Sequence, residues 1–152
     1  MRRVLFVCTA NICRSPTAEH YMRHLLGRLG SEDRIEVRSA GILGIEGREA
    51  DPVVVQLLRK RGIDMSGHRS RGVDAEEARG ATSIVVMERR HKAWFREHLP
   101  DVLDRVTLIR EHVDGPKDLA DPIGESLDRY QECLGILLQA VENLTVTVSY
   151  PS

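Results

Sequence analysis

The sequence lacks the features that identify membrane, secreted and nucleic-acid-binding proteins. No stretch approaches the ~20 consecutive apolar residues of a membrane-spanning helix, and the start at 1–7 is too short for a signal peptide. Neither sign of charge is in excess, because 22 Lys and Arg residues nearly balance 23 Asp and Glu residues. Such a balance gives no chain-wide attraction for nucleic acid or an anionic membrane. We therefore expect a cytoplasmic protein with no membrane span and no nucleic-acid partner, in which any phosphate binding is local.

Cysteine is also scarce, with three residues in 152. Three thiols cannot all pair, and Cys8 and Cys13 lie too close in sequence for a structural disulfide framework. A chain of this length buries a sufficient core without disulfides or metals. We expect one domain over 1–152 that contains a free thiol with a chemical role. The tail, 145–152, alternates valine with polar residues, which fits an edge strand or a loose end.

Short apolar runs alternate with helical stripes along the chain. The runs predict strands at 4–7, 35–37, 82–87 and 106–109, and the stripes predict helices at 16–29, 52–61, 89–98 and 127–144. Strands that alternate with helices form parallel sheets whose crossovers place helices on both faces. We therefore predict an α/β fold, a three-layer sandwich around a four-stranded parallel sheet. Ligands of such folds bind beyond the carboxyl ends of the strands.

The segment that joins the first strand to the first helix carries the strongest chemical signal. Its residues 8–15 read CTANICRS, and we call them the 8–15 loop. Backbone N–H groups and the helix dipole converge at such a turn and attract anions. The dipole, the amides and Arg14 all stabilise the Cys8 thiolate, which makes it a better nucleophile than a free cysteine. A nucleophile and a guanidinium at opposite ends of one loop suit the capture and attack of a phosphate group.

These residues resemble a known family. Residues 8–16, read as C-x-x-N-x-C-R-S-P, look like the phosphate loop of low-molecular-weight protein tyrosine phosphatases. The resemblance continues through Ser39-Ala40-Gly41, through Gly62-Ile63-Asp64 with His68 and Arg71, and through Asp121-Pro122. It implies a flavodoxin-like fold, a phosphocysteine intermediate, no cofactor and no metal. It also implies a phosphorylated protein as substrate, with phosphate or another oxyanion bound in the loop.

The resemblance assigns roles to individual residues. Cys8 is the expected nucleophile, Arg14 the clamp for phosphate oxygens, and Asp121 the general acid and later base. Ser15 is expected to donate its hydroxyl to the Cys8 thiolate, within a network that preorganises the loop. That network comprises Asn11, Ser15, Ser39 and His68. The phosphate-binding residues implied are Thr9, Ala10, Asn11, Ile12, Cys13, Arg14 and Ser15.

The sequence departs from the family pattern around the loop. Ala10 stands where glycine is usual, which strains the loop if that position needs a positive φ. Ile45 and Ile123 stand where aromatic residues are common, so that aliphatic walls, together with Ile12, are expected to contact the substrate. In the families that this loop resembles, a branched apolar residue at Ile12 goes with phosphotyrosine and threonine goes with phosphoarginine. We therefore expect a phosphotyrosine phosphatase, with a protein arginine phosphatase as the alternative.

Several side chains allow two interpretations. Cys13 either packs under the loop or forms a reversible disulfide with Cys8, and Cys133 is expected only to pack. His20 and His24, with Glu19 beside them, superficially suit a metal, but they lie opposite the apolar stripe and are expected on a solvated face. Asp118 competes with Asp121 as the general acid, and only the resemblance favours Asp121.

Two further classes of protein are less compatible with the sequence. A thiol-dependent arsenate reductase of related fold needs two more cysteines after the third strand, and 87–99 contains none. A non-catalytic phosphopeptide-binding module has no need of Cys8, Arg14 and Asp121 together.

Overall fold

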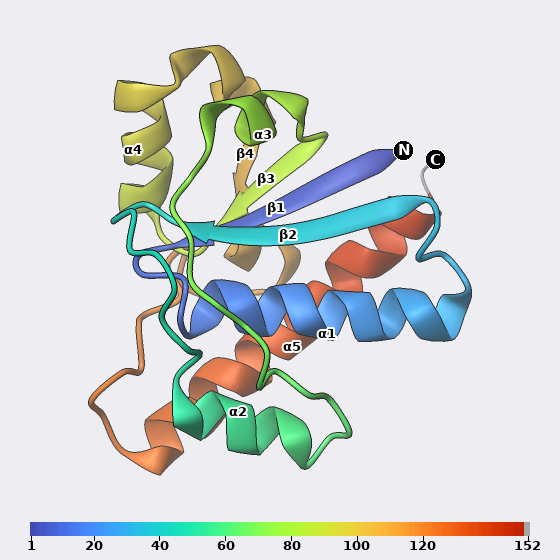
Figure 1. The fold of residues 1–152 in the computed structure, drawn as a ribbon, viewed down its shortest axis with the longest axis vertical. Helices are drawn as coiled ribbons and strands as arrows, with labels where there is room; N and C mark the ends of the chain where they lie inside the picture. Colours follow the sequence, from blue (N-terminus) through green and yellow to red (C-terminus); the bar gives the residue numbers. More distant parts are fainter. Residues whose placement is uncertain (151–152) are drawn as a thin grey trace.

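A four-stranded parallel sheet forms the centre of the computed structural model, which describes residues 1–150 (Figure 1). The strands are β1 (Arg2–Cys8), β2 (Ile35–Gly41), β3 (Ser83–Val86) and β4 (Val106–Leu108), in the order β2-β1-β3-β4. All neighbouring pairs are parallel. The predicted α/β fold is confirmed, and the carboxyl ends of the four strands meet at one edge of the sheet.

Helices cover both faces of this sheet (Figure 1). One face carries α1 (Arg14–Leu29), α2 (Pro52–Arg59) and α5 (Leu127–Ser149), and the other carries α3 (Ala75–Gly80) and α4 (Arg89–His98). Two 3-10 helices, η1 (Pro100–Arg105) and η2 (Ile109–His112), flank β4. The sequence had not predicted α3, η1 or η2.

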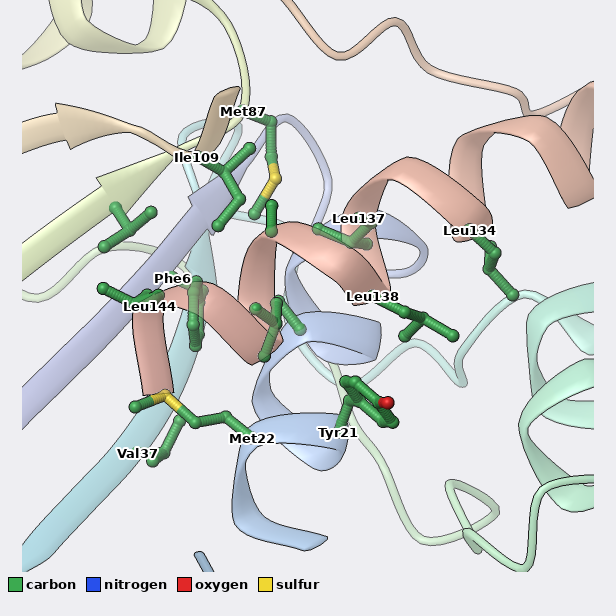
Figure 2. Packing of buried hydrophobic residues seen from close by; sticks show 14 of the residues in the cluster. Phe6, Tyr21, Met22, Val37, Met87, Ile109, Leu134, Leu137, Leu138 and Leu144 are labelled. Atoms are coloured by element: carbon green, nitrogen blue, oxygen red, sulfur yellow. The ribbon is translucent and has the colours of Figure 1, made fainter. Parts of the chain in front are cut away.

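Each face of the sheet has its own hydrophobic core, because successive side chains of β1 point to opposite faces. Val4 and Phe6 join the core beneath α1 and α5, while Leu5 and Val7 join the core beneath α3 and α4. Figure 2 shows the first core, in which Phe6 lies among side chains of α1 and α5. Burial on both sides explains why the first strand reads as a continuous apolar run. The central strand thus holds the loop that follows it on a rigid base.

The chain reverses sharply after α1. Gly30 adopts a left-handed φ of 67°, and Ser31 donates its N–H to the carbonyl of Leu26 to close the last turn. This supports the prediction that the first helix ends at Gly30.

The tail differs from both of its predicted forms. Residues 145–149 continue α5 as helix, and Thr145 and Val148 are buried. The Arg2 guanidinium donates a 2.9 Å hydrogen bond to the carbonyl of Val148. Residues 145–149 are therefore neither an edge strand nor loose, while the last two residues of the predicted tail lie outside the described chain. Within residues 1–150, no helix combines the length and apolar character needed to cross a membrane.

Candidate active site

The 8–15 loop lies at the carboxyl edge of the sheet, between β1 and α1. The end of β2 passes directly beneath it at Gly41, which pairs with Cys8 in the sheet. A Cβ atom at Gly41 would lie 2.8 Å from the carbonyl carbon of Ala10 and 2.8 Å from the carbonyl oxygen of Thr9. Glycine at this position therefore lets the loop pack onto the sheet.

Cys8 is buried at the start of the loop, where its thiol faces a hydroxyl. Its Sγ lies 2.9 Å from the Oγ of Ser15. The side-chain amide of Asn11 donates a 2.8 Å hydrogen bond to the same hydroxyl oxygen. Since Asn11 is the donor in this contact, the hydroxyl proton of Ser15 can be donated to a thiolate on Cys8 at 2.9 Å, which is nearer than its other acceptor, the Ala40 carbonyl at 3.4 Å.

Asn11 holds the loop in shape. It has a φ of 61°, whereas Ala10 is not in the left-handed region, so the strain expected at Ala10 lies at Asn11 instead. Asparagine tolerates this conformation better than most residues. Its side-chain amide also donates to Ser39 at 2.9 Å, and its carbonyl faces the Nε2 of His68 at 2.8 Å. The four residues predicted to form a network therefore lie together.

Arg14 is fully buried at the first turn of α1, and its guanidinium is held along one edge. The Nη1 atom donates to Glu88 at 2.6 Å and to the carbonyl of Leu119 at 2.7 Å. The Nε atom is buried without a hydrogen-bond partner, and Nη2 donates one 3.3 Å hydrogen bond, to the hydroxyl of Thr9. Nε and Nη2 form the edge of a guanidinium that binds two oxygens at once. The anchored side chain therefore leaves this edge available for an oxyanion.

Asp121 lies beside Arg14, with 3.9 Å between its Oδ2 and the Arg14 Nη2. Its other carboxylate oxygen accepts a 3.0 Å hydrogen bond from the backbone N–H of Ile123. Asp118 turns away to Arg89, whose backbone N–H it accepts at 2.8 Å. Hydrogen bonds from Arg89 lower the pKa of Asp118 below its ordinary value. Of the two predicted acids, Asp121 is therefore the one that lies next to the guanidinium.

The N-terminus of α4 contributes three residues that the sequence reasoning missed. Glu88 binds Arg14, Arg90 donates to the hydroxyl of Thr9 at 2.7 Å, and the Nε2 of His91 lies 2.9 Å from the same hydroxyl. Burial opposes ionisation of Glu88, but hydrogen bonds from Arg90 and Arg14 keep its pKa below the ordinary value. The sequence did offer a signal for Glu88, Arg90 and His91, because they follow β3 closely and ligands bind beyond the carboxyl ends of parallel strands.

Three aliphatic side chains predicted as substrate walls are not fully buried. Ile12 and Ile45 are half-buried, and Ile123 is exposed. The carbonyl of Ile12 accepts a 2.8 Å hydrogen bond from the backbone N–H of Asp51, which fixes the backbone of that residue. Leu43, exposed on the segment that follows β2, is a further apolar residue that the sequence reasoning did not single out.

The other two cysteines are buried thiols. Burial raises the pKa of Cys13 far above its ordinary value and raises the pKa of Cys133 to about 12. Both groups therefore remain protonated near neutral pH, and a protonated thiol is a poor nucleophile.

The solvated face predicted for the start of α1 is wrong for Glu19 and His20. Glu19 is buried, accepts a hydrogen bond from the hydroxyl of Ser39 and forms an ion pair with Arg23. His20 is half-buried, and its ring lies edge-on to the ring of His68 with 5.8 Å between the centroids. The segment around 67–71 packs against this side of α1, so part of the polar face of the helix is covered.

Together these groups suit nucleophilic displacement at phosphorus. A thiol lies at one end of a loop, a guanidinium edge at the other, and a carboxylate beside the guanidinium. A phosphate between them would meet a nucleophile and a proton donor on separate sides.

Comparisons with known proteins agree with this geometry. Residues 3–150 match the family model described as low molecular weight phosphotyrosine protein phosphatase. The chain is 33% identical to a protein-arginine-phosphatase of Geobacillus stearothermophilus over 145 residues, which cover 93% of each chain. It is 32% identical to the low molecular weight protein-tyrosine-phosphatase Etp of Escherichia coli (strain K12), over 90% of this chain and 88% of Etp.

The fold agrees as well. The crystal structure of the tyrosine phosphatase Wzb from Escherichia coli K30, in complex with sulphate, superposes with a TM-score of 0.86 at 27% identity. The superposition covers 96% of this chain and 97% of Wzb. The chain therefore belongs to the low molecular weight phosphotyrosine protein phosphatase family and is a cysteine-dependent phosphatase.

Proposed function

We propose that the protein hydrolyses phosphotyrosine in phosphorylated proteins, with Cys8 as nucleophile, Arg14 as phosphate clamp and Asp121 as general acid and base. The observation that carries this proposal is the arrangement of Arg14. Its guanidinium is fixed from behind by Glu88 and Leu119, and its Nε is buried without a partner. An unsatisfied buried donor beside the thiol loop costs stability, and a bound phosphate oxygen satisfies it.

The reaction proceeds in two displacements. The Cys8 thiolate attacks phosphorus and forms the S–P bond, while the bond to the leaving oxygen breaks and that oxygen takes a proton from Asp121. The Asp121 carboxylate then takes a proton from water, whose oxygen attacks phosphorus. The S–P bond breaks, phosphate leaves, and the Cys8 thiolate is regenerated.

The loop is built to stabilise charge in both steps. Ser15 donates its hydroxyl to the thiolate when that thiolate forms or departs, and Asn11 keeps Ser15 oriented. Arg14 follows the phosphate oxygens with two parallel hydrogen bonds. Because these donors are fixed before substrate binds, they need no reorganisation in the transition state.

Ile12 supports tyrosine as the substrate class. Its side chain offers apolar contact to an aryl ring at the loop, and it has no hydroxyl to pair with a guanidinium or to orient water. Arg90 donates to Thr9 at the edge of the loop. A cation near the bound phosphate would repel the guanidinium of phosphoarginine, which also supports tyrosine. The 33% identity to a protein-arginine-phosphatase favours the second candidate, phosphoarginine hydrolysis by the same three residues.

The test compares phosphotyrosine and phosphoarginine peptides of matched sequence on the wild type and on Ile12→Thr. We expect the wild type to prefer phosphotyrosine in kcat/KM by at least about tenfold, and Ile12→Thr to narrow or reverse that ratio. Cys8→Ser is the control, and it should retain phosphate binding while losing turnover of both peptides. A wild type that prefers phosphoarginine refutes the tyrosine assignment and leaves the three catalytic roles standing. Turnover by Cys8→Ser near the wild-type rate refutes the nucleophile.

A further inference from the structure

Three potential metal ligands converge beside Asn11 and Ser39, which support the 8–15 loop. Glu19, His20 and His68 each offer one ligand atom, and these atoms all lie within 4.8 Å of one another. Glu19 and His68 are buried, and His20 is half-buried. They line a cavity of about 450 Å³ that opens between α1 and the 67–71 segment.

The hydrogen bonding of His68 leaves one ring nitrogen available. Its Nε2 lies 2.8 Å from the carbonyl oxygen of Asn11, and a carbonyl oxygen only accepts, so Nε2 carries the proton. The lone pair of Nδ1 is then free. Histidines that bind metals almost always donate their other ring N–H to a carbonyl or carboxylate in this way.

Glu19 retains ligand capacity although it is already paired. One of its oxygens accepts from Ser39 and the other from Arg23, and each carboxylate oxygen has two lone pairs. The remaining arginines that line the cavity also have hydrogen-bond or ion-pair partners. Arg38 pairs with Glu36, Arg71 with Glu77, and Arg69 donates to the carbonyl of His68. These pairs reduce the repulsion that a cation would meet, although four guanidinium groups nearby still weaken its binding.

We propose that Glu19, His20 and His68 form a binding site for Zn²⁺ or a similar divalent transition metal, separate from the site of phosphate chemistry. Two imidazoles and one carboxylate are a ligand set that zinc accepts, with water from the cavity as fourth ligand. Tetrahedral zinc holds such ligand atoms roughly 3.3 Å apart. Since the three atoms lie within 4.8 Å of one another, each separation must shorten by about 1.5 Å at most when the metal binds. The side chain of His20, only half-buried at the cavity, is the one free to make that adjustment.

A metal here would act on the loop through Asn11. His68 bonds to the carbonyl of Asn11, and Glu19 reaches its side-chain amide through Ser39. Both lines of contact therefore end on the residue with the left-handed φ of 61°. Metal binding would stiffen the supports of the loop without contacting Cys8.

The test is calorimetric titration of Zn²⁺ into the full chain carrying Cys8→Ser, a substitution that removes the competing thiolate of the 8–15 loop. We expect one equivalent of Zn²⁺ to bind and to raise Tm. Adding His20→Ala should weaken Zn²⁺ binding by at least about tenfold and abolish the rise in Tm. Losing a group that only hydrogen-bonds to a metal ligand already lowers metal affinity by about tenfold, and His20 is proposed as a ligand itself. His20 is half-buried on a helix surface and lies outside the catalytic machinery, so this variant is expected to fold.

His24→Ala is the matched control, because His24 lies one helical turn further along α1 and is also half-buried. It should bind Zn²⁺ as the Cys8→Ser chain does. Three results overturn the proposal: no binding by the Cys8→Ser chain, unchanged binding after His20→Ala, or equal weakening by His24→Ala. The last result would place the metal on the two helix histidines and not on His68.

Discussion

The two aspartates of the 114–124 loop differ in what they bind, and that difference gives them different chemistry. Asp118 is committed to the backbone and guanidinium of Arg89, which stabilise its charged form. Asp121 has its Oδ2 directed toward Arg14 and keeps that oxygen free of shorter contacts. The same loop is held at Leu119, whose N–H donates to the carbonyl of Met87 and whose carbonyl accepts from Arg14. Under the proposed mechanism, this free oxygen of Asp121 is the one that exchanges a proton with the leaving group and with water.

Asp121→Ala is expected to slow hydrolysis by about a hundredfold for an aryl phosphate with a poor leaving group, and much less for one with a good leaving group. The reason is that a good leaving group departs with little protonation. The measurement is kcat/KM over a series of aryl phosphates of graded leaving-group pKa. Asp118→Ala is the control and should shift all substrates equally, if at all. A steeper dependence in Asp118→Ala would reassign the acid.

The residues of the candidate site could be predicted from their own chemistry where they lie in one contiguous motif, whereas Ser39, His68 and Asp121 were predicted only through the family resemblance. Cys8, Asn11, Arg14 and Ser15 are found because the turn and its chemistry occupy eight successive positions. Glu88 and its neighbours on α4 come from a distant segment, and their pattern in the sequence is that of an ordinary charged helix start. Only the sheet order, which sets β3 beside β1, brings that segment to the loop.

At the scale of elements, α5 shows how a short pattern misleads. Val146 and Val148 alternate with polar residues, which fits a strand, but the helix that begins at Leu127 simply continues through them to Ser149. In a helix, residues two apart point in different directions. Val148 is accordingly buried at 9% exposure while Val146 is 58% exposed. The segment is helical and not a strand because Thr145 and Val148 extend the buried stripe of α5.

This difference predicts unequal effects of the same substitution. Val148→Asp is expected to lower the free energy of unfolding by about 2 kcal/mol, because it places a carboxylate in an apolar contact. Val146→Asp should change it by less than about 0.5 kcal/mol. Urea denaturation of both variants measures the two values. Equal effects would indicate that both valines share one environment, as they would in a strand or a loose tail.

At the scale of the whole molecule, the alternation of strands and helices was enough to predict the architecture. The central strands β1 and β3 are largely buried on both faces, so each keeps an apolar run in the sequence. In the edge strands β2 and β4 buried residues alternate with more exposed ones, and the long covering helices keep an apolar stripe. The short α3 and the two 3-10 helices leave no such signal, because they span about one or two turns. Tertiary contacts, such as the packing of Ala78 in the second core, determine them instead.

The stability of the whole fold should also depend on pH through its buried histidines. Burial and the charge of Arg14 lower the pKa of His91 from 6.5 to about 4, and its Nδ1 accepts the backbone N–H of Glu88. Burial lowers the pKa of His20 and His112 as well. Below pH 6.5 these histidines are therefore protonated in the unfolded chain while they remain largely neutral in the folded chain. Stability is then fully present above pH 6.5 and falls as the pH drops toward 4.

For His91 alone, the fall between pH 7 and pH 5 amounts to about 2 kcal/mol. We expect His91→Asn to reduce the fall in the free energy of unfolding between pH 7 and pH 5 by that amount, because asparagine does not titrate. This expectation concerns the difference between the two pH values and not the stability of the variant at pH 7. His98→Asn, an exposed position on the same helix, should leave the fall unchanged. Urea denaturation of the three chains at both pH values gives the comparison. An unaltered fall in His91→Asn would mean that His91 does not remain neutral in the folded state, and the orientation of its ring against Glu88 and Thr9 would need revision.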